Sequence, residues 1–151
     1  MLSEMLDKKH FLFADSFATW QEAIRASCQP LEADGTVDNT YSQQIIDCIN
    51  KYGPYIVIAP MIAMPHSQEN AEGVHGTAIS FMKTQEIVAF DPDDREKDAR
   101  LFFTIATQNH EQHLKNISAL AMMLDNEALI EDLLIAETEK DLRELCRKYH
   151  I

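Results

Sequence analysis

The chain has 151 residues, a length that fits one ordinary domain and lets roughly 68–70% of the unfolded chain's surface be buried on folding. Hydrophobic residues make up 46% of it, with only 4 glycines and 5 prolines, which excludes a disordered or low-complexity protein. Its 25 acidic and 13 basic residues give a formal net charge of −12, so nucleic acid and anionic lipid surfaces should repel it. A partner with a basic face would be attracted, although solubility alone also explains the charge.

The N-terminal segment MLSEMLDKKHFLF carries acidic residues before its lysines and has no continuous apolar core, so it does not resemble a signal peptide. No apolar run approaches the roughly 18–20 residues that a membrane-spanning helix needs. We therefore expect a soluble, cytoplasmic protein with no direct membrane insertion. The odd number of cysteines and the lack of a C-x-x-C pair indicate reduced, structural thiols. These cysteines are Cys28, Cys48 and Cys146.

Two helices are expected in the first third of the chain. The segment 19–22, TWQE, matches a capping box and predicts a helix from Trp20 to about Leu31. Asn39 or Thr40 can cap a second helix, which should run from about residue 40 to Tyr52, because apolar residues recur there at helical spacing.

The middle of the chain changes to the pattern of strands. Short β-branched and aromatic runs at 55–59, 77–82 and 101–106 predict three strands. The near-continuous hydrophobicity of the first and third runs indicates a sheet that is covered on both faces. The loop 91–98 is charged and should be solvated.

Helical spacing returns in the last third, from Gln112 to Leu124, around 127–134 and from Thr138 onward. Helices on both sides of a central set of strands, with no linker, predict a single-domain α/β fold over residues 1–151. We expect a three-layer sandwich, in which a mixed β-sheet has helices on both faces.

The common nucleotide-binding, hydrolase and zinc-protease motifs are absent, so the histidines are the candidates for chemistry. Of the six, His10 and His150 lie near the ends and should be exposed and without a role. His75 lies in a turn and should end a solvated segment.

His66 differs because of the residues before it. Pro60 and Pro65 fix φ and cannot donate a hydrogen bond to a sheet, so the strand must end in a stiffened loop that holds the imidazole in place. Such a loop at the end of a buried strand often carries reactive groups, although a structural loop histidine is the alternative.

The segments GPYIVIAP at 53–60 and AMPH at 63–66 resemble the active-site segment of the enzyme IIA domains of the bacterial phosphoenolpyruvate-dependent sugar phosphotransferase system, in the mannitol/fructose family. The G-P-Y, I-A-P and A-M-P-H pattern is most similar to the ascorbate-type branch. The resemblance extends to Q-H-L at 112–114 and covers essentially the whole chain, which implies one enzyme IIA type 2 domain over residues 1–151.

This resemblance implies a phosphocarrier, and hence a phosphotransferase. His66 would take a phosphoryl group from the phosphorylated histidine-containing carrier protein HPr and pass it to a cysteine of enzyme IIB. The branch resemblance implies ascorbate uptake, and no metal or organic cofactor is required. Neutral imidazole suits this chemistry, because its unperturbed pKa of about 6.5 leaves it a free nucleophile at neutral pH.

The family also implies a second active-site histidine. His113, in the Q-H-L segment, matches its position and would bind the phosphoryl oxygens as charge develops. His110 is the alternative. Mannitol-type members carry an arginine near the end of the second helix, where this chain has only Lys51, which could neutralise phosphate as a point charge.

Two interpretations are open for three apolar residues near His66. Met61, Ile62 and Met64 could form an adaptable rim for docking a partner protein, or they could pack in the core.

Two further functions stay open at this point. One is a regulatory module of the same fold that is controlled by phosphorylation of the same histidine. The other is a metal-dependent enzyme that uses His66, His110 and His113, since His110 and His113 have ligand spacing.

Overall fold

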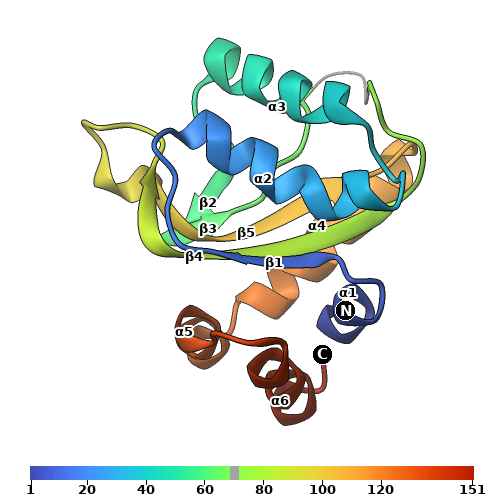
Figure 1. Ribbon diagram of the computed structural model, residues 1–151, viewed down its shortest axis with the longest axis vertical. Helices are drawn as coiled ribbons and strands as arrows, with labels where there is room; N and C mark the ends of the chain where they lie inside the picture. Colours follow the sequence, from blue (N-terminus) through green and yellow to red (C-terminus); the bar gives the residue numbers. More distant parts are fainter. Residues whose placement is uncertain (69–71) are drawn as a thin grey trace.

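A five-stranded mixed sheet lies between two layers of helices in the computed structural model, which describes residues 1–68 and 72–151 (Figure 1). The strands are β1 (Phe11–Ala14), β2 (Val57–Ala59), β3 (Met61–Ala63), β4 (Ala78–Ala89) and β5 (Asp98–Ala106). The helices are α1 (Leu2–Asp7), α2 (Trp20–Ala33), α3 (Asn39–Tyr52), the 3-10 turn η1 (Arg95–Lys97), α4 (His110–Leu124), α5 (Glu127–Ile135) and α6 (Glu139–Tyr149). The predicted α/β three-layer sandwich is confirmed.

The strands follow the order β1-β4-β5-β3-β2 across the sheet. β1 pairs parallel with β4 and β3 pairs parallel with β5, whereas the pairs β4–β5 and β2–β3 are antiparallel. β3 and β5 therefore end at the same edge of the sheet, and the chain that leaves each of them enters the same region.

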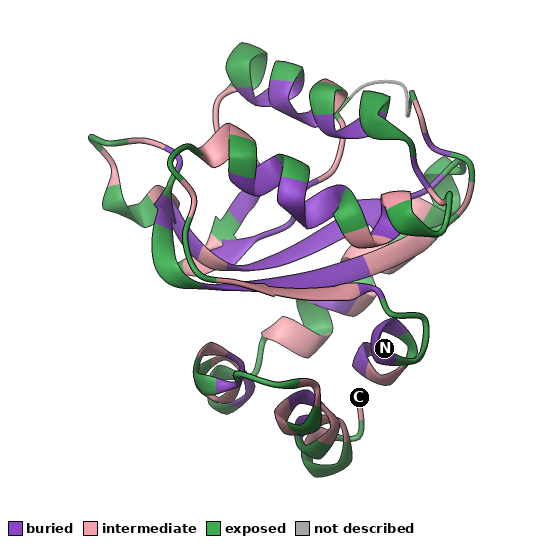
Figure 2. Cartoon of the chain, viewed as in Figure 1, coloured by how far each residue is buried: buried purple, intermediate pink, exposed green. Residues whose placement is uncertain are grey.

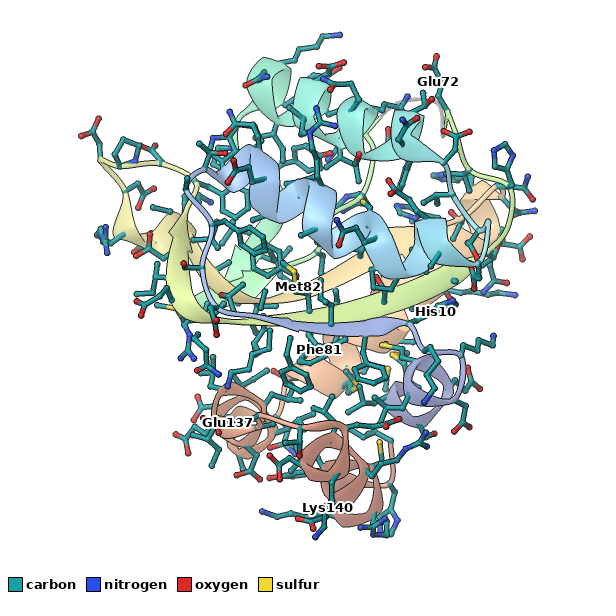
Figure 3. All side chains as sticks on the ribbon, in the orientation of Figure 1. His10, Glu72, Phe81, Met82, Glu137 and Lys140 are labelled. Atoms are coloured by element: carbon teal, nitrogen blue, oxygen red, sulfur yellow. The ribbon has the colours of Figure 1, made fainter. Side chains whose placement is uncertain are left out.

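Two hydrophobic cores fill the spaces on the two faces of the sheet. α2 and α3 cover one face, and α1, α4, α5 and α6 pack on the other (Figure 1). The buried sides of α2 and α3 are turned toward the sheet (Figure 2). Phe81 and Met82, adjacent on β4, point to opposite faces, as side chains in a strand must (Figure 3). A sheet buried on both sides explains the near-continuous apolar runs of the sequence.

The helix starts follow from capping side chains. The Thr19 side chain accepts a hydrogen bond from the backbone N–H of Glu22, as the TWQE pattern predicts, and Thr138 forms a full capping box with Asp141. The second helix is capped one residue earlier than predicted, because the Asp38 carboxylate accepts the N–H of Thr40.

The first fifteen residues contain structure that the sequence did not predict. α1 packs against α6, and β1 forms the edge of the sheet. The prediction that His10 is exposed and without a role was wrong. It is 3% exposed, and its Nε2 lies 2.5 Å from an Asp34 carboxylate oxygen at the end of α2. His10 is buried because its backbone extends the β1 ladder, with its carbonyl accepting the N–H of Phe81.

The strand boundaries also differ from the prediction. Tyr55 belongs to a turn, in which its N–H donates to the Gly53 carbonyl at 2.8 Å, so β2 begins only at Val57. β5 begins at Asp98, which is 3% exposed, so the end of the charged loop 91–98 belongs to the sheet.

The remaining expectations concern the thiols and the membrane. All three cysteines are free, as predicted, and burial raises the pKa of the Cys28 thiol to about 12. None of the helices in the described part of the chain has the length and apolar character of a membrane span.

Candidate active site

The loop that follows β3 is tied to its neighbours on both sides. The N–H of Met64 donates to the Ile56 carbonyl at 2.8 Å, and the N–H of Ile105 donates to the Pro65 carbonyl at 3.0 Å. Met64 itself is 2% exposed and packs in the core under the sheet. Proline has no N–H, so its carbonyl is the only backbone group through which Pro65 can be held. The sequence predicted one stiffened loop across both prolines, but residues 61–63 form β3, and only the segment after β3 is a loop, which these hydrogen bonds hold.

The imidazole of His66 has one ring nitrogen engaged. Its Nδ1 lies 2.6 Å from the Met64 carbonyl oxygen, and because a carbonyl can only accept, Nδ1 must carry the proton. In the neutral ring, Nε2 then holds the free lone pair. The pKa of His66 is lowered by burial, and the bond to Met64 opposes this only in part. His66 is therefore a neutral imidazole with a defined nucleophilic nitrogen near neutral pH.

Tyr55 contacts His66 from the turn before β2. The two rings meet edge to face, with 5.2 Å between centroids and 87° between planes. The Tyr55 hydroxyl also donates to the backbone carbonyl of His66. One side chain therefore contacts both the ring and the backbone of the histidine.

His113 reaches the same place from the start of α4. The Asn109 side chain caps this helix by accepting the N–H of Gln112, and the Asn109 carbonyl accepts the N–H of His113 at 3.0 Å. The centroids of the His66 and His113 rings lie 5.4 Å apart, with 47° between the planes. Burial lowers the pKa of His113, and the charges of His66 and His110 lower it further.

The side chains of His66 and His113 border a surface hollow of about 460 Å³. Its walls come from the loop after β3, the turn after β5 and the N-terminal half of α4. The lining residues are His66, Ser67, Gln68, Thr107, Gln108, Asn109, His110, His113, Leu114 and Ile117. A hollow with two neutral imidazoles and a helix N-terminus suits a small anionic group on one imidazole.

The structure brings three of the predicted site residues together and leaves one apart. His66, His113 and the exposed His110 all line the hollow, and their individual roles stay a prediction. Lys51 lines a different hollow, on α3. His75 is exposed, as expected, and its Nε2 lies 2.8 Å from a carboxylate oxygen of Asp38.

The docking rim that the sequence suggested around His66 is mostly wrong. Ile62 and Met64 are 3% and 2% exposed and belong to the core, and only Met61 is partly exposed. Among residues 1–68 and 72–151, no group of three or more His, Cys, Asp or Glu side chains is arranged to hold a metal ion.

Sequence reasoning assigned no role to several residues of the site. Thr107, Gln108 and Asn109 line the hollow between β5 and α4, and their signal was their place directly after an apolar strand and before a helix. Tyr55 stands in the G-P-Y segment, but nothing in the sequence shows that its side chain turns back to His66.

Residues 4–149 match the family described as phosphoenolpyruvate-dependent sugar phosphotransferase system, EIIA 2. The ascorbate-specific PTS system EIIA component of Escherichia coli (strain K12) is 31% identical over 128 residues, which cover 84% of this chain and 82% of that protein.

Two solved structures from Escherichia coli are also similar. The mannitol-specific cryptic phosphotransferase enzyme IIA CmtB has 29% identity and a TM-score of 0.84, covering 97% of this chain and 98% of that one. The IIA of mannitol, solved in a complex with phosphorylated enzyme IIB, has 28% identity and a TM-score of 0.77, covering 93% and 95%. The chain therefore belongs to the EIIA 2 family of the sugar phosphotransferase system, whose members are phosphotransferase proteins that carry a phosphoryl group between the partners of that system.

Proposed function

We propose that His66 is the residue that carries the phosphoryl group, taking it from phosphorylated HPr and passing it to a cysteine of enzyme IIB. The contact between His66 Nδ1 and the Met64 carbonyl carries this proposal, because it leaves Nε2 as the nucleophile on a ring that lines an open hollow. The protein then works between two protein partners and needs no pocket for the sugar itself.

Acceptance of the phosphoryl group is a single displacement at phosphorus. The lone pair of His66 Nε2 forms a new N–P bond while the N–P bond of the donor phosphohistidine breaks, and the donor ring leaves with its electron pair. His66 keeps its Nδ1 proton, so its ring becomes positively charged. The hydrogen bond to the Met64 carbonyl thereby becomes charge-assisted and stabilises the phosphorylated form.

Release to enzyme IIB reverses these changes. A cysteine thiolate of IIB forms an S–P bond, the N–P bond to His66 breaks, and the electron pair returns to Nε2. The imidazole is again neutral and ready for the next donor, and no proton has to leave Nδ1 in either step.

His113 is the second active-site histidine in this proposal. Its ring lies beside that of His66 and it belongs to the start of α4, where backbone N–H groups and the helix dipole favour negative charge. His113 stabilises the transferring phosphoryl oxygens by donating a hydrogen bond and does not carry the group.

The relatives support the IIB partner and the sugar of this proposal. The similar IIA of mannitol was solved with phosphorylated IIB, which supports a IIB partner for this chain, and the ascorbate-specific relative supports ascorbate as the transported compound.

The deciding experiment is incubation of the protein with phosphoenolpyruvate, enzyme I and HPr, followed by intact mass measurement. The parent should gain one acid-labile, base-stable phosphoryl group, and His66→Ala should gain none. His150→Asn is the matched control, because His150 is exposed at the end of α6 in a left-handed conformation that asparagine tolerates. A phosphorylated His66→Ala protein would overturn the proposal.

A second assay tests the substrate branch. The phosphorylated protein is offered IIB of the ascorbate type and IIB of the mannitol type, and the rate of dephosphorylation is measured. Faster transfer to the ascorbate-type IIB is expected, and preference for the mannitol type would reverse the assignment.

A further inference from the structure

The backbone of His66 is held differently from that of the two residues before it. Met64 and Pro65 are held by backbone bonds to Ile56 and Ile105. The carbonyl of His66 instead accepts a hydrogen bond from the Tyr55 hydroxyl. The backbone that sets the direction of the reactive imidazole is therefore fixed by a group that a single substitution can remove.

The ring of Tyr55 restrains the imidazole as well. The two rings pack edge to face, with 5.2 Å between centroids and 87° between planes, so rotation of the imidazole about its bond to Cβ would be hindered. Rotation by half a turn would exchange Nδ1 with Cδ2 and Nε2 with Cε1, so it would break the bond to Met64 and displace the nucleophilic nitrogen. The hydrogen bond to Met64 opposes the same rotation from the other side.

Tyr55 can do this because of the turn that precedes β2. Gly53 ends α3 with φ at +83°, in the left-handed region that glycine adopts easily, and the N–H of Tyr55 donates back to the Gly53 carbonyl. The N–H of Val57 donates to the Pro54 carbonyl at 3.2 Å. These bonds close the turn and fix the position from which the phenol reaches His66.

We infer that Tyr55 is a positioning residue for phosphoryl transfer, holding the backbone and ring of His66 so that Nε2 is the nitrogen presented to the donor. The inference rests on the proposed function of His66. Tyr55 acts through His66 and does not itself touch the phosphoryl group.

Two variants of Tyr55 separate the contribution of its hydroxyl group from that of its ring. Tyr55→Phe keeps the ring contact and removes the hydrogen bond to the His66 carbonyl, whereas Tyr55→Leu removes both. Tyr52→Phe is the matched control, since Tyr52 is 51% exposed at the end of α3 and does not line the hollow. Circular dichroism checks that each variant is folded.

The first measurement needs no partner protein. Nitrogen-15 NMR of the unphosphorylated protein reports which ring nitrogen of each histidine carries the proton. We expect a single Nδ1–H tautomer for His66 in the parent and in Tyr52→Phe, and a mixture of tautomers in Tyr55→Leu. A single Nδ1–H tautomer in Tyr55→Leu would overturn the positioning role of the ring, whatever the outcome of the phosphorylation assay.

The second measurement is the rate of phosphorylation by phosphorylated HPr over a range of HPr concentrations. Loss of one hydrogen bond should lower the maximal rate of Tyr55→Phe about three- to tenfold and leave the half-saturating HPr concentration unchanged. A raised half-saturating concentration with a normal maximal rate would make Tyr55 a docking residue and overturn the inference. Equal rates in Tyr55→Phe and the parent would overturn the role of the hydroxyl while leaving His66 as the acceptor. An unphosphorylated parent would instead refute the proposed function, and the NMR result would then judge Tyr55 alone.

Discussion

The ring of His113 lies beside that of His66, tilted by 47° and with 5.4 Å between centroids, although the two residues come from different layers of the fold. His66 belongs to the loop after a strand of the sheet, and His113 to a helix that packs on one face of it. One imidazole is bound through Nδ1 to a backbone carbonyl, and both imidazoles line the same hollow. In the proposed function, the two histidines have separate tasks.

Replacing His113 should slow phosphorylation without abolishing it. If His113 donates a hydrogen bond to the developing charge, His113→Ala should lose on the order of 10²–10³ in rate, like the loss of one oxyanion-hole donor. Single-turnover phosphorylation of the parent, His113→Ala and His110→Ala under one set of conditions measures this. A slow His110→Ala with a normal His113→Ala would exchange the two roles, and parent-like rates in both would leave His66 acting alone.

The rate at which the protein accepts a phosphoryl group should depend on pH through the protonation of His66. Because burial lowers its pKa, the folded protein keeps this imidazole neutral below 6.5, where a histidine of the unfolded chain is already gaining its proton. The phosphorylation rate should therefore stay level as pH falls to 6.5 and drop only at lower pH. The stability that the neutral ring contributes is also lost as pH falls through this lowered pKa. NMR titration of His66 and the pH profile of single-turnover phosphorylation should agree, and a midpoint at or above 6.5 would contradict the prediction.

The rate of phosphoryl transfer from HPr should fall as the salt concentration rises. A protein of net charge −12 that meets a basic carrier surface gains its association rate from electrostatic attraction, so the second-order rate should fall by about tenfold or more from low to high ionic strength. The first-order rate at saturating HPr is the internal control and should not change. If the second-order rate is also unaffected by salt, the charge serves solubility only.

The contact between the buried His10 ring and the exposed Asp34 carboxylate should stabilise the fold. His10→Ala removes a 3% exposed side chain and its hydrogen bond, so the free energy of unfolding should fall by about 1–3 kcal/mol. Urea denaturation measures this, with His150→Asn as the control at an exposed histidine. An unchanged midpoint in His10→Ala would show that the contact contributes nothing.

Asp34 adds a pH dependence to the same contact. Burial acts to raise its pKa, but hydrogen bonds from Thr36 and His10 outweigh burial and lower the pKa from 3.8 to about 2. A carboxyl whose pKa is depressed on folding stabilises the protein above its unfolded value, and this stability is lost as pH falls from about 4 toward 2. The stability difference between the parent and Asp34→Asn should shrink over that range, and a difference that stays constant would refute the assignment.

Much of the fold could be predicted because its signals are local. The capping residues Thr19 and Thr138 and the apolar runs near β4 and β5 depend only on neighbouring residues. β1 and β3 were not predicted because they have four and three residues, too few for a periodic pattern. They form by pairing with β4 and β5, which lie far away in the sequence. The burial of His10 depends on the same distant pairing.

Some features of the candidate site could likewise be predicted from the sequence, and others could not. The two prolines before His66 could be read from the sequence as a stiff loop. The choice between His110 and His113 could not be read, because residues three apart lie on one face of a helix and only the packing of α4 decides which ring reaches His66. The contact of Tyr55 with His66 requires the chain to reverse between β2 and β3, and no local pattern encodes it.

The backbone hydrogen bonds from Met64 to Ile56 and from Ile105 to Pro65 also limit how the loop after β3 moves. These two amides join the loop to β5 and to the segment before β2, so they should be among the slowest to exchange their hydrogen for deuterium. A histidine carried on such a segment samples few orientations between encounters. In the proposed function, the donor protein and the acceptor protein would then supply the motion that phosphoryl exchange requires, because the histidine itself stays still.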